Sequence, residues 1–344
     1  MGIKNLTKFI RDKFPDTLIN LDIKNLKYTK IAVDTSLYLC KYKSLYGENW
    51  LASFINLICC LREQDIHPYF VFDGKAPTEK SLEKDKRKEA RQKLEDTILQ
   101  LEIDYDDYIN NGIVSKNLLQ FYNNNNKQTR ILGKNKINCD LLSKFIKRKK
   151  SQLFNITNED IILLKELFDN FGIQYIIAKT EAEKLCAKLC IDNVVQSVLS
   201  EDTDLIAYCT PCIITKLNIY NKTATMIDID VLLKTLNYTK EQLLDFCILC
   251  GTDYNNNINK VGNVSAFKLI SDNKNIESID KYDTSVLNYT KVRELFTNFD
   301  DCETFDLLYS AKPDYDKLTE FISLNDIDYS IEDIKSRLSN KIIF

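Results

Sequence analysis

Short apolar runs alternate along this chain with segments in which apolar residues recur every three or four positions. The runs are rich in β-branched and aromatic residues, as at 68–72 and 194–199, which is typical of buried parallel strands. The segments between them have the spacing of amphipathic helices. Strands that alternate with helices predict an α/β fold with a mostly parallel central sheet and helices on both faces.

The pattern places the individual elements as follows. Strands are expected over residues 31–33, 68–72, 173–177, 194–199, 213–216 and 224–226. Helices are expected over residues 4–14, 35–40, 51–64, 78–101, 158–170, 180–190, 230–236 and 239–250, and a further helix opens at the turn 259–262. Thr180 is the expected N-cap of its helix. Residues 103–138 have a weak pattern, and we interpret them as a mobile cap or insertion with a polar loop at 123–126.

Acidic residues directly follow three of the predicted strands. Asp34 follows the first, Asp73 follows the second, and the run 194–199 leads into residues 201–204. In an open α/β sheet, ligands bind at the edge where the carboxyl ends of the strands meet. If the backbone stays extended, Asp202 and Asp204 project to the same side. Carboxylates in one crevice repel one another unless a cation lies between them. One such segment alone would indicate a solvated acidic loop, whereas three predict a metal site.

The composition excludes several other chemistries. The 344 residues have 44% hydrophobic and 28% charged content, which describes an ordinary globular protein. His67 is the only histidine, which rules out the paired-His zinc motif, and it lies at the entrance to a predicted strand, so Ser-His-Asp catalysis also loses its key residue. Neither a Walker A motif nor a dinucleotide-binding glycine fingerprint is present, and the chemistry must therefore rest on carboxylates. No apolar run is long enough to span a bilayer and no signal-peptide core is present. The eleven cysteines, odd in number and scattered through apolar segments, indicate a reducing compartment.

Nucleic-acid binding must come from local patches, because the net charge is only −3. Four basic residues share one stripe of the predicted helix 78–101: Lys80, Lys84, Arg87 and Arg91. By itself this stripe is typical of a solvated helix with charge pairs one turn apart. Directly after Asp73, however, it can clamp phosphates beside a metal site. A second basic cluster lies at 147–150, and the turn at Gly262 can offer backbone N–H groups to a phosphate.

The cysteines allow an alternative metal site. Cys209, Cys212, Cys247 and Cys250 have a spacing that a four-thiolate zinc or iron–sulfur site can use. Cys247 and Cys250 lie in an apolar helix, however, where cysteine commonly serves as a small core residue. We therefore favour a core role for them.

In order along the chain, these segments resemble the flap endonuclease branch of the XPG-type, structure-specific 5′ nucleases, which have a PIN-like nuclease domain. The matching segments are residues 1–3, 33–36, 71–75, 181–183, 201–204 and 247–254. The resemblance extends from the N-terminus to about residue 270 and is looser over 313–339. It also implies a helical arch or cap and a helix–two-turn–helix element. The Asn and Lys content hints at an AT-rich genome and a viral member of the family.

The resemblance implies seven carboxylates that bind two Mg²⁺ ions, with Mn²⁺ as an alternative, and hard oxygen ligands suit these ions. The seven are Asp34, Asp73, Glu181, Glu183, Asp202, Asp204 and Asp253. Lys80 and Arg87 match the family's basic pair, whose implied role is to hold the scissile phosphate and stabilise transition-state charge. Gly2 matches the N-terminal residue near the DNA path.

The segment around Gly262 matches the helix–two-turn–helix that grips duplex DNA, often with a monovalent cation such as K⁺. Lys260, Gly262 and Ser265 are the DNA-binding residues expected there, and Lys84 and Arg91 are expected on the basic helix. Lys260 stands where the family usually has the first glycine of the turn.

The resulting hypothesis is a Mg²⁺-dependent enzyme that hydrolyses phosphodiester bonds at 5′ flap–duplex junctions, together with 5′–3′ exonuclease activity, in DNA replication, repair or recombination. The alternatives are a four-way-junction or bubble nuclease of the same family, a catalytically inactive DNA-binding scaffold, and a PIN-type ribonuclease. Four regions are expected: nuclease residues 1–91, an arch or cap at 92–157, nuclease residues 158–254, and a helix–two-turn–helix and C-terminal helical region at 255–344.

We expect a monomer that binds branched DNA, without a recognisable sliding-clamp-binding tail and without membrane association. Its expected location is an intracellular reducing compartment, the nucleus or cytoplasm, or the viral replication site for a viral protein.

Overall fold

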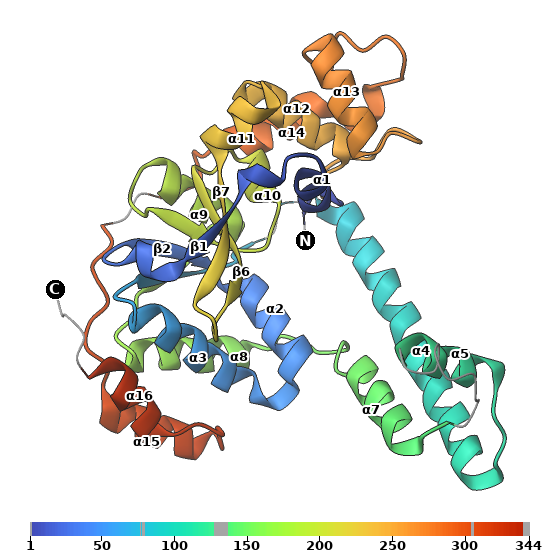
Figure 1. Cartoon of the computed structure of the whole chain (residues 1–344), viewed down its shortest axis with the longest axis vertical. Coiled ribbons are helices and arrows are strands. Elements are labelled where there is room, and N and C mark those ends of the chain that lie inside the picture. The colour runs from blue at the N-terminus through green and yellow to red at the C-terminus, as the bar shows by residue number, and fades with distance from the viewer. Residues whose placement is uncertain (1, 76, 78–79, 127–136, 304–305, 340–344) are drawn as a thin grey trace.

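The computed structural model describes residues 2–75, 77, 80–126, 137–303 and 306–339, and for residues 81–84 it describes only the helical backbone. Its centre is a seven-stranded sheet in the order β1-β7-β6-β5-β2-β3-β4 (Figure 1). The five strands from β6 to β4 are parallel, and β7 runs antiparallel to both of its neighbours, β6 and β1, so the predicted α/β fold with a mostly parallel sheet is confirmed. The strands are β1 Leu18–Asp22, β2 Lys30–Asp34, β3 His67–Phe72, β4 Tyr175–Ile177, β5 Ser197–Leu199, β6 Cys212–Asn218 and β7 Thr223–Asp228.

The register of the central strands aligns their carboxyl ends. Val33 on β2 lies opposite Phe70 on β3 and Leu199 on β5. The acids that follow these strands therefore leave the sheet at the same edge. The edge strand β1 was not predicted. It pairs with β7, which lies about two hundred residues further along the chain, so this pairing cannot be predicted from neighbouring residues.

Helices cover both faces of the sheet, each over its own apolar core. One face carries α1 Leu6–Lys13, α9 Ala182–Ile191, α10 Asp204–Ala207, α11 Ile229–Leu236 and α12 Lys240–Cys250, and its core continues into α13 Asn263–Asn273 and α14 Tyr289–Thr297. The other face carries α2 Thr35–Tyr46, α3 Trp50–Arg62 and α8 Asn158–Asn170, together with the C-terminal pair α15 Tyr315–Leu324 and α16 Ile331–Leu338. None of the helices described is both long and apolar enough to cross a membrane.

Three helices extend from this body: α4 Ser81–Asn111, α5 Lys116–Asn125 and α7 Cys139–Lys150 (Figure 1). We call them the arch. They share a separate small core made of Leu101, Leu118, Tyr122, Ile137, Leu142 and Ile146. Contacts across the base of the arch join Arg91 Nη1 to Phe154 O at 3.0 Å and Lys150 Nζ to Glu102 at 2.7 Å. The helix α4 passes without interruption through the boundary expected between residues 91 and 92.

Two expectations about this region need correction. The helix expected at 78–101 continues to Asn111, while its expected start at 78–79 lies outside the described residues. The polar loop expected at 123–126 is instead mostly the last turn of α5. That helix forms because the Ser115 hydroxyl accepts a hydrogen bond from Leu118 N–H at 3.0 Å, which caps it. Leu118 and Tyr122 lie one turn apart and bury the same face.

Candidate active site

Asp34 and Asp73 lie at the carboxyl ends of β2 and β3, and each accepts a hydrogen bond from a backbone N–H at the start of a helix. Asp34 Oδ1 accepts from Leu37 N–H at 3.1 Å, which caps α2, and its other oxygen accepts from the Ser200 hydroxyl at 3.0 Å. Asp73 Oδ1 accepts from Ala182 N–H at 2.8 Å, at the start of α9. Both carboxylates therefore lie at positive helix N-termini, where negative charge is stabilised.

Glu181 and Glu183 lie in the first turn of α9. The prediction that Thr180 is the N-cap of this helix was wrong, because Glu181 occupies the N-cap position. The Thr180 hydroxyl instead donates a hydrogen bond to Asp301 at 2.8 Å. The reason is tertiary, since Asp73, which directly follows β3, already accepts the first helical N–H. Gly74 makes this approach possible, because a Cβ there would lie 1.9 Å from the carbonyl oxygen of residue 178.

Asp202 and Asp204 come together through a turn rather than through extended backbone. Asp204 already begins α10, and its N–H donates to Asp202 Oδ1 at 3.0 Å. The expectation of a shared extended face was therefore wrong, although the two carboxylates do adjoin. Gly2 packs against both with a φ of +70°, and a Cβ there would lie 2.1 Å from Asp202 Oδ1 and 2.6 Å from Asp204 Oδ1. Only glycine fits this position without displacing a carboxylate.

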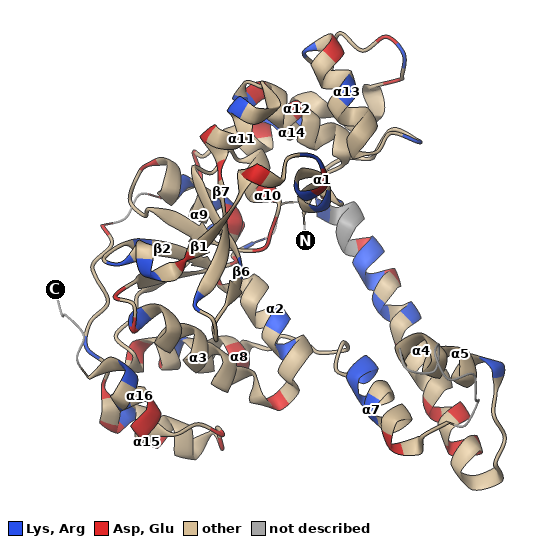
Figure 2. Ribbon diagram, in the orientation of Figure 1, with Lys and Arg blue, Asp and Glu red and all other residues tan. Residues whose placement is uncertain are grey.

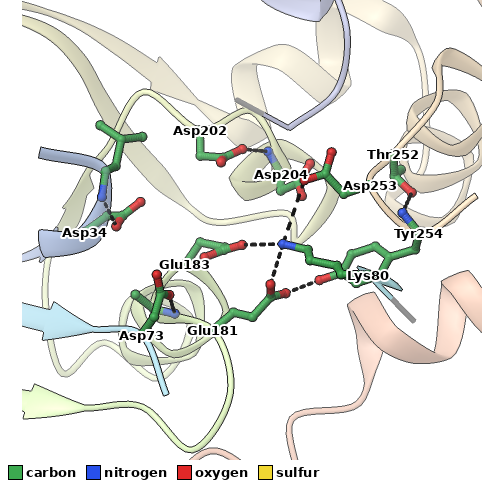
Figure 3. Close-up of polar contacts among 12 residues, drawn as sticks. Asp34, Asp73, Lys80, Glu181, Glu183, Asp202, Asp204, Thr252, Asp253 and Tyr254 are labelled. Carbon is green, nitrogen blue, oxygen red and sulfur yellow. Dashed lines mark hydrogen bonds and ion pairs between the residues drawn. The ribbon is translucent and has the colours of Figure 1, made fainter. Parts of the chain in front are cut away.

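Asp253 reaches the site from the loop after α12. The helix ends at Gly251, whose φ is +98°. Asn255 Oδ1 then accepts from the N–H of Thr252 at 3.1 Å and from its hydroxyl at 2.6 Å. This turn, built by an asparagine side chain, directs the carboxylate of Asp253 toward the other acids (Figure 3).

The ammonium group of Lys80 lies at the centre of these acids (Figure 3). It forms an ion pair with Glu181, lies 3.3 Å from Glu183 Oε1, and lies 3.9 Å from Asp253 Oδ2. Burial acts to lower the pKa of Lys80, but the surrounding carboxylates, Glu183 first, outweigh burial and raise it. Arg87, about two turns beyond Lys80 on α4, donates to Asp253 Oδ2 at 2.8 Å. The predicted basic pair and the predicted acids thus form one cluster.

The cluster has an excess of buried negative charge. Burial, followed by the charges of Asp73 and Asp202, raises the pKa of Asp34 to about 7. Burial and neighbouring carboxylates also hold the pKa values of Glu183 and Asp204 well above their ordinary range. Asp204 Oδ1 is buried and has no hydrogen-bond partner among the described residues. Such a group requires a cation or a proton.

The donors suit a hard divalent ion, because all seven are carboxylates and one buried oxygen has no partner. Within the described ranges, no three acidic, histidine or cysteine side chains are already arranged to hold a metal. Three of the acids, Glu181, Glu183 and Asp253, instead contact the ammonium group of Lys80. The individual roles of the seven carboxylates as ligands stay a prediction.

The remaining predicted DNA-binding residues lie in three places. Arg91 turns toward the arch base and also pairs with Glu95 at 3.0 Å, while the side chain of Lys84 lies outside the described part. Lys260 has a left-handed φ of +63°, a conformation that suits glycine, which explains the glycine usual at this position in the family. Gly262 is the N-cap of α13, and Ser265 is exposed in its first turn.

A groove of about 550 Å³ opens beside the acids. It is lined by residues 2–5, Lys86, residues 251–253 and residues 255–257. Asn263 at the start of α13 donates to the carbonyl oxygen of Lys4 at 3.1 Å, so the N-terminal segment bridges the acids and α13. The Lys and Arg residues of α4 all lie in its first half, where acids are interspersed among them, whereas the charged residues of its second half are all Asp or Glu (Figure 2). We call the first half the basic half. The basic half is the one that borders the acids.

Sequence reasoning missed two polar residues of the site. Ser200 binds Asp34 through its hydroxyl, which also accepts from Asp202 N–H at 3.1 Å. Tyr254 donates a hydrogen bond to Glu181. Each directly adjoins a predicted acidic segment, which was the available signal. Their partners are distant in the chain, so the sequence alone did not identify the contacts.

His67 and the four spaced cysteines lie elsewhere. His67 is buried, and burial followed by the charge of Arg62 lowers its pKa to about 4. Its Nδ1 accepts from Ser310 N–H at 3.1 Å, which ties the C-terminal segment to β3. Cys247 and Cys250, on α12, are buried in the apolar core of that face, whereas Cys209 and Cys212 are half-buried.

Comparisons with known proteins agree with this architecture. The XPG N-terminal domain matches residues 1–94 and the XPG I-region matches residues 172–253. The chain is 40% identical over 327 residues to the probable RAD2-like endonuclease 076L of Invertebrate iridescent virus 3, covering 86% of this chain and 85% of that protein. It is 27% identical to flap endonuclease 1 of Cryptosporidium parvum, covering 94% of this chain and 66% of that one. The fold matches the catalytic core of Rad2 in complex with DNA substrate with a TM-score of 0.69 at 19% identity, over 97% of this chain and 99% of that one.

The sheet, the arch and the carboxylate rim define a PIN-like α/β nuclease. The chain belongs to the XPG/RAD2 family of structure-specific DNA nucleases. The resemblance inferred from the motifs is thereby confirmed, and the viral relative supports a viral source. The comparisons do not favour the alternative functions.

Proposed function

We propose that the protein cuts branched DNA at the junction of a 5′ single strand and a duplex, with two Mg²⁺ ions. The observation that carries this proposal is the convergence of seven carboxylates at one sheet edge, directly beside the basic half of α4. Bound divalent ions supply an activated water and stabilise the departing oxygen, which is the chemistry that phosphodiester hydrolysis needs. The residues that would hold them are Asp34, Asp73, Glu181, Glu183, Asp202, Asp204 and Asp253.

The basic residues hold the phosphate. Lys80 and Arg87 both reach the acids from α4, at 3.3 Å from Glu183 and 2.8 Å from Asp253. Their positive charges lie where the phosphate of a bound strand adds negative charge, so they orient it and stabilise charge that develops during cleavage. Because Lys80 is buried among carboxylates, its ammonium group keeps its proton and acts as a fixed charge.

The DNA strands follow the remaining basic and polar surface. The 5′ strand lies along the basic half of α4 above the base of the arch, while duplex DNA contacts the start of α13 at Lys260, Gly262 and Ser265. There K⁺ is the expected monovalent ion, and backbone N–H groups at the start of a helix suit phosphate oxygens. A monomer suffices for this arrangement, since one chain supplies every group, and the free thiols suit a reducing compartment such as the nucleus, the cytoplasm or a viral replication site.

The test is cleavage of a 5′-labelled flap duplex in Mg²⁺ and in Mn²⁺. We expect cutting at the junction, a loss of about 100- to 1,000-fold in Asp202→Asn, and retained DNA binding by that variant. Equal cutting by the variant would refute the carboxylate site. Flaps with free and blocked 5′ ends report on passage through the arch and on exonuclease activity, and a four-way junction of the same arm sequences tests the substrate. Faster cutting of the four-way junction would overturn the flap assignment.

A further inference from the structure

The side chain of Tyr254 lies between the acidic site and α14. Its hydroxyl donates a hydrogen bond to Glu181 Oε2, and its backbone N–H donates to the Thr252 hydroxyl oxygen at 3.2 Å. The Thr252 hydroxyl is in turn fixed on Asn255 at 2.6 Å. The backbone of Tyr254 is therefore held by the turn that also places Asp253.

The ring of Tyr254 is held from the opposite side. Phe296 of α14, which is 2% exposed, packs edge-on against it, with 5.4 Å between the ring centroids and an interplanar angle of 86°. Phe296 also packs against Tyr208 at 4.7 Å, at the end of α10. Aromatic pairs of this geometry are favourable beyond the area that they bury. The direction of the Tyr254 hydroxyl is thus set by a helix that lies outside the nuclease sheet.

The two oxygens of Glu181 have different partners. Tyr254 engages Oε2, whereas Oε1 forms the ion pair with the Lys80 ammonium group. The ammonium group is the cation that this structure places within the acids, so it marks the direction in which Oε1 points. The same ammonium group lies 5.2 Å from the centroid of the Tyr254 ring, within the range of a cation–π contact.

We propose that Tyr254 is a positioning residue of the metal site. Its hydroxyl holds one oxygen of Glu181 and so directs the other toward the ion, and its ring sets the position of Lys80. The inference rests on the proposed function. Groups that orient a metal ligand typically change metal affinity by 10- to 100-fold, and the hydroxyl and the ring can be removed separately.

The variant Tyr254→Phe removes the hydroxyl and keeps the ring. We expect Mg²⁺ binding to the full-length protein, measured by isothermal titration calorimetry, to weaken by 10- to 100-fold, with kcat on the flap duplex close to that of the wild type at saturating Mg²⁺. Tyr254→Leu also removes the ring, and we expect it to lower kcat even at saturating Mg²⁺, because Lys80 loses its support. This split between affinity and turnover is one that general destabilisation does not produce.

Tyr238→Phe is the matched control. The Tyr238 hydroxyl donates to Phe267 O at 2.7 Å, so the control also loses a phenol hydrogen bond, but away from the acids. We expect unchanged Mg²⁺ affinity for it. Wild-type affinity in Tyr254→Phe, or an equal loss in Tyr238→Phe, would overturn the inference. Failure of the wild-type protein to bind Mg²⁺ or to cut the flap would instead overturn the proposed function.

Discussion

The variant Asp34→Asn replaces a buried, titratable carboxyl group with an amide that stays neutral at every pH. Asp34 is 4% exposed, and burial followed by the charges of Asp73 and Asp202 raises the pKa of its carboxyl from 3.8 to about 7. The folded protein therefore holds the proton more tightly than the unfolded chain. The resulting stability is fully present below about pH 4 and is lost as the pH rises through 7. The change in pKa corresponds to about 4 kcal/mol, of which the interval from pH 5 to pH 7 spans about 2 to 3 kcal/mol.

The assay is thermal unfolding in EDTA at pH 5 and pH 8, followed by circular dichroism. The amide oxygen of asparagine can still accept the N–H of Leu37, so the cap on α2 is kept. We expect the melting temperature of Asp34→Asn, relative to the wild type, to be higher at pH 8 than at pH 5 by roughly 4 °C, which corresponds to about 2 kcal/mol. The same difference at both pH values would refute the reasoning, because it would mean that Asp34 does not titrate in this range.

Asp160→Asn is the control with the opposite sign. Burial acts to raise the pKa of Asp160, but its ion pair with Lys43 at 2.5 Å and its hydrogen bonds to Thr157 outweigh burial and lower it. The stability that this carboxylate contributes is therefore present above its unfolded pKa and is lost as the pH falls through its folded value. We expect Asp160→Asn to melt below the wild type at pH 8. Addition of Mg²⁺ should raise the melting temperature of the wild type more than that of Asp34→Asn.

Three further predictions concern the surroundings of the site. Gly2→Ala should reduce flap cleavage by about 10- to 100-fold. The added Cβ would lie only 2.1 Å from Asp202 Oδ1, so the Asp202 carboxylate would have to move. Gly112→Ala, with a similar φ of +69° and nothing within 4 Å, should leave the cleavage rate unchanged, and equal loss in both would contradict the clash. Arg293→Leu should destabilise the protein by about 3–5 kcal/mol in thermal unfolding. The buried carboxylate of Asp245 on α12 would lose the two hydrogen bonds that Arg293 donates to it, both 2.7 Å long. Leu142→Ala should weaken the separate arch core by about 2–5 kcal/mol, seen as faster hydrogen exchange in α5 and α7 with unchanged exchange in the central sheet; slower or uniform exchange would contradict an independent core.

The alternation of strands and helices, and the acids at the strand ends, follow from the amino-acid pattern alone. Periodicity of apolar residues is a local property, so the helix at 158–170 was predicted with its observed limits. Asp34 is the last residue of β2 and Asp73 directly follows β3, and parallel pairing alone brings such positions to one edge. The order of the motifs also identified the family. These features depend only on residues that are neighbours in the chain or on the common geometry of parallel sheets.

The contacts between particular groups at that edge depend on the packing of the whole chain. Asp73 displaced Thr180 as the partner of the α9 terminus, and a turn rather than extended backbone joined Asp202 to Asp204. The strand β1, the place of Lys80 among the acids, and the contact of Tyr254 with α14 depend on segments far apart in sequence. A propensity acts within a few residues, whereas a hydrogen bond or an ion pair depends on which distant groups the packed core brings within reach.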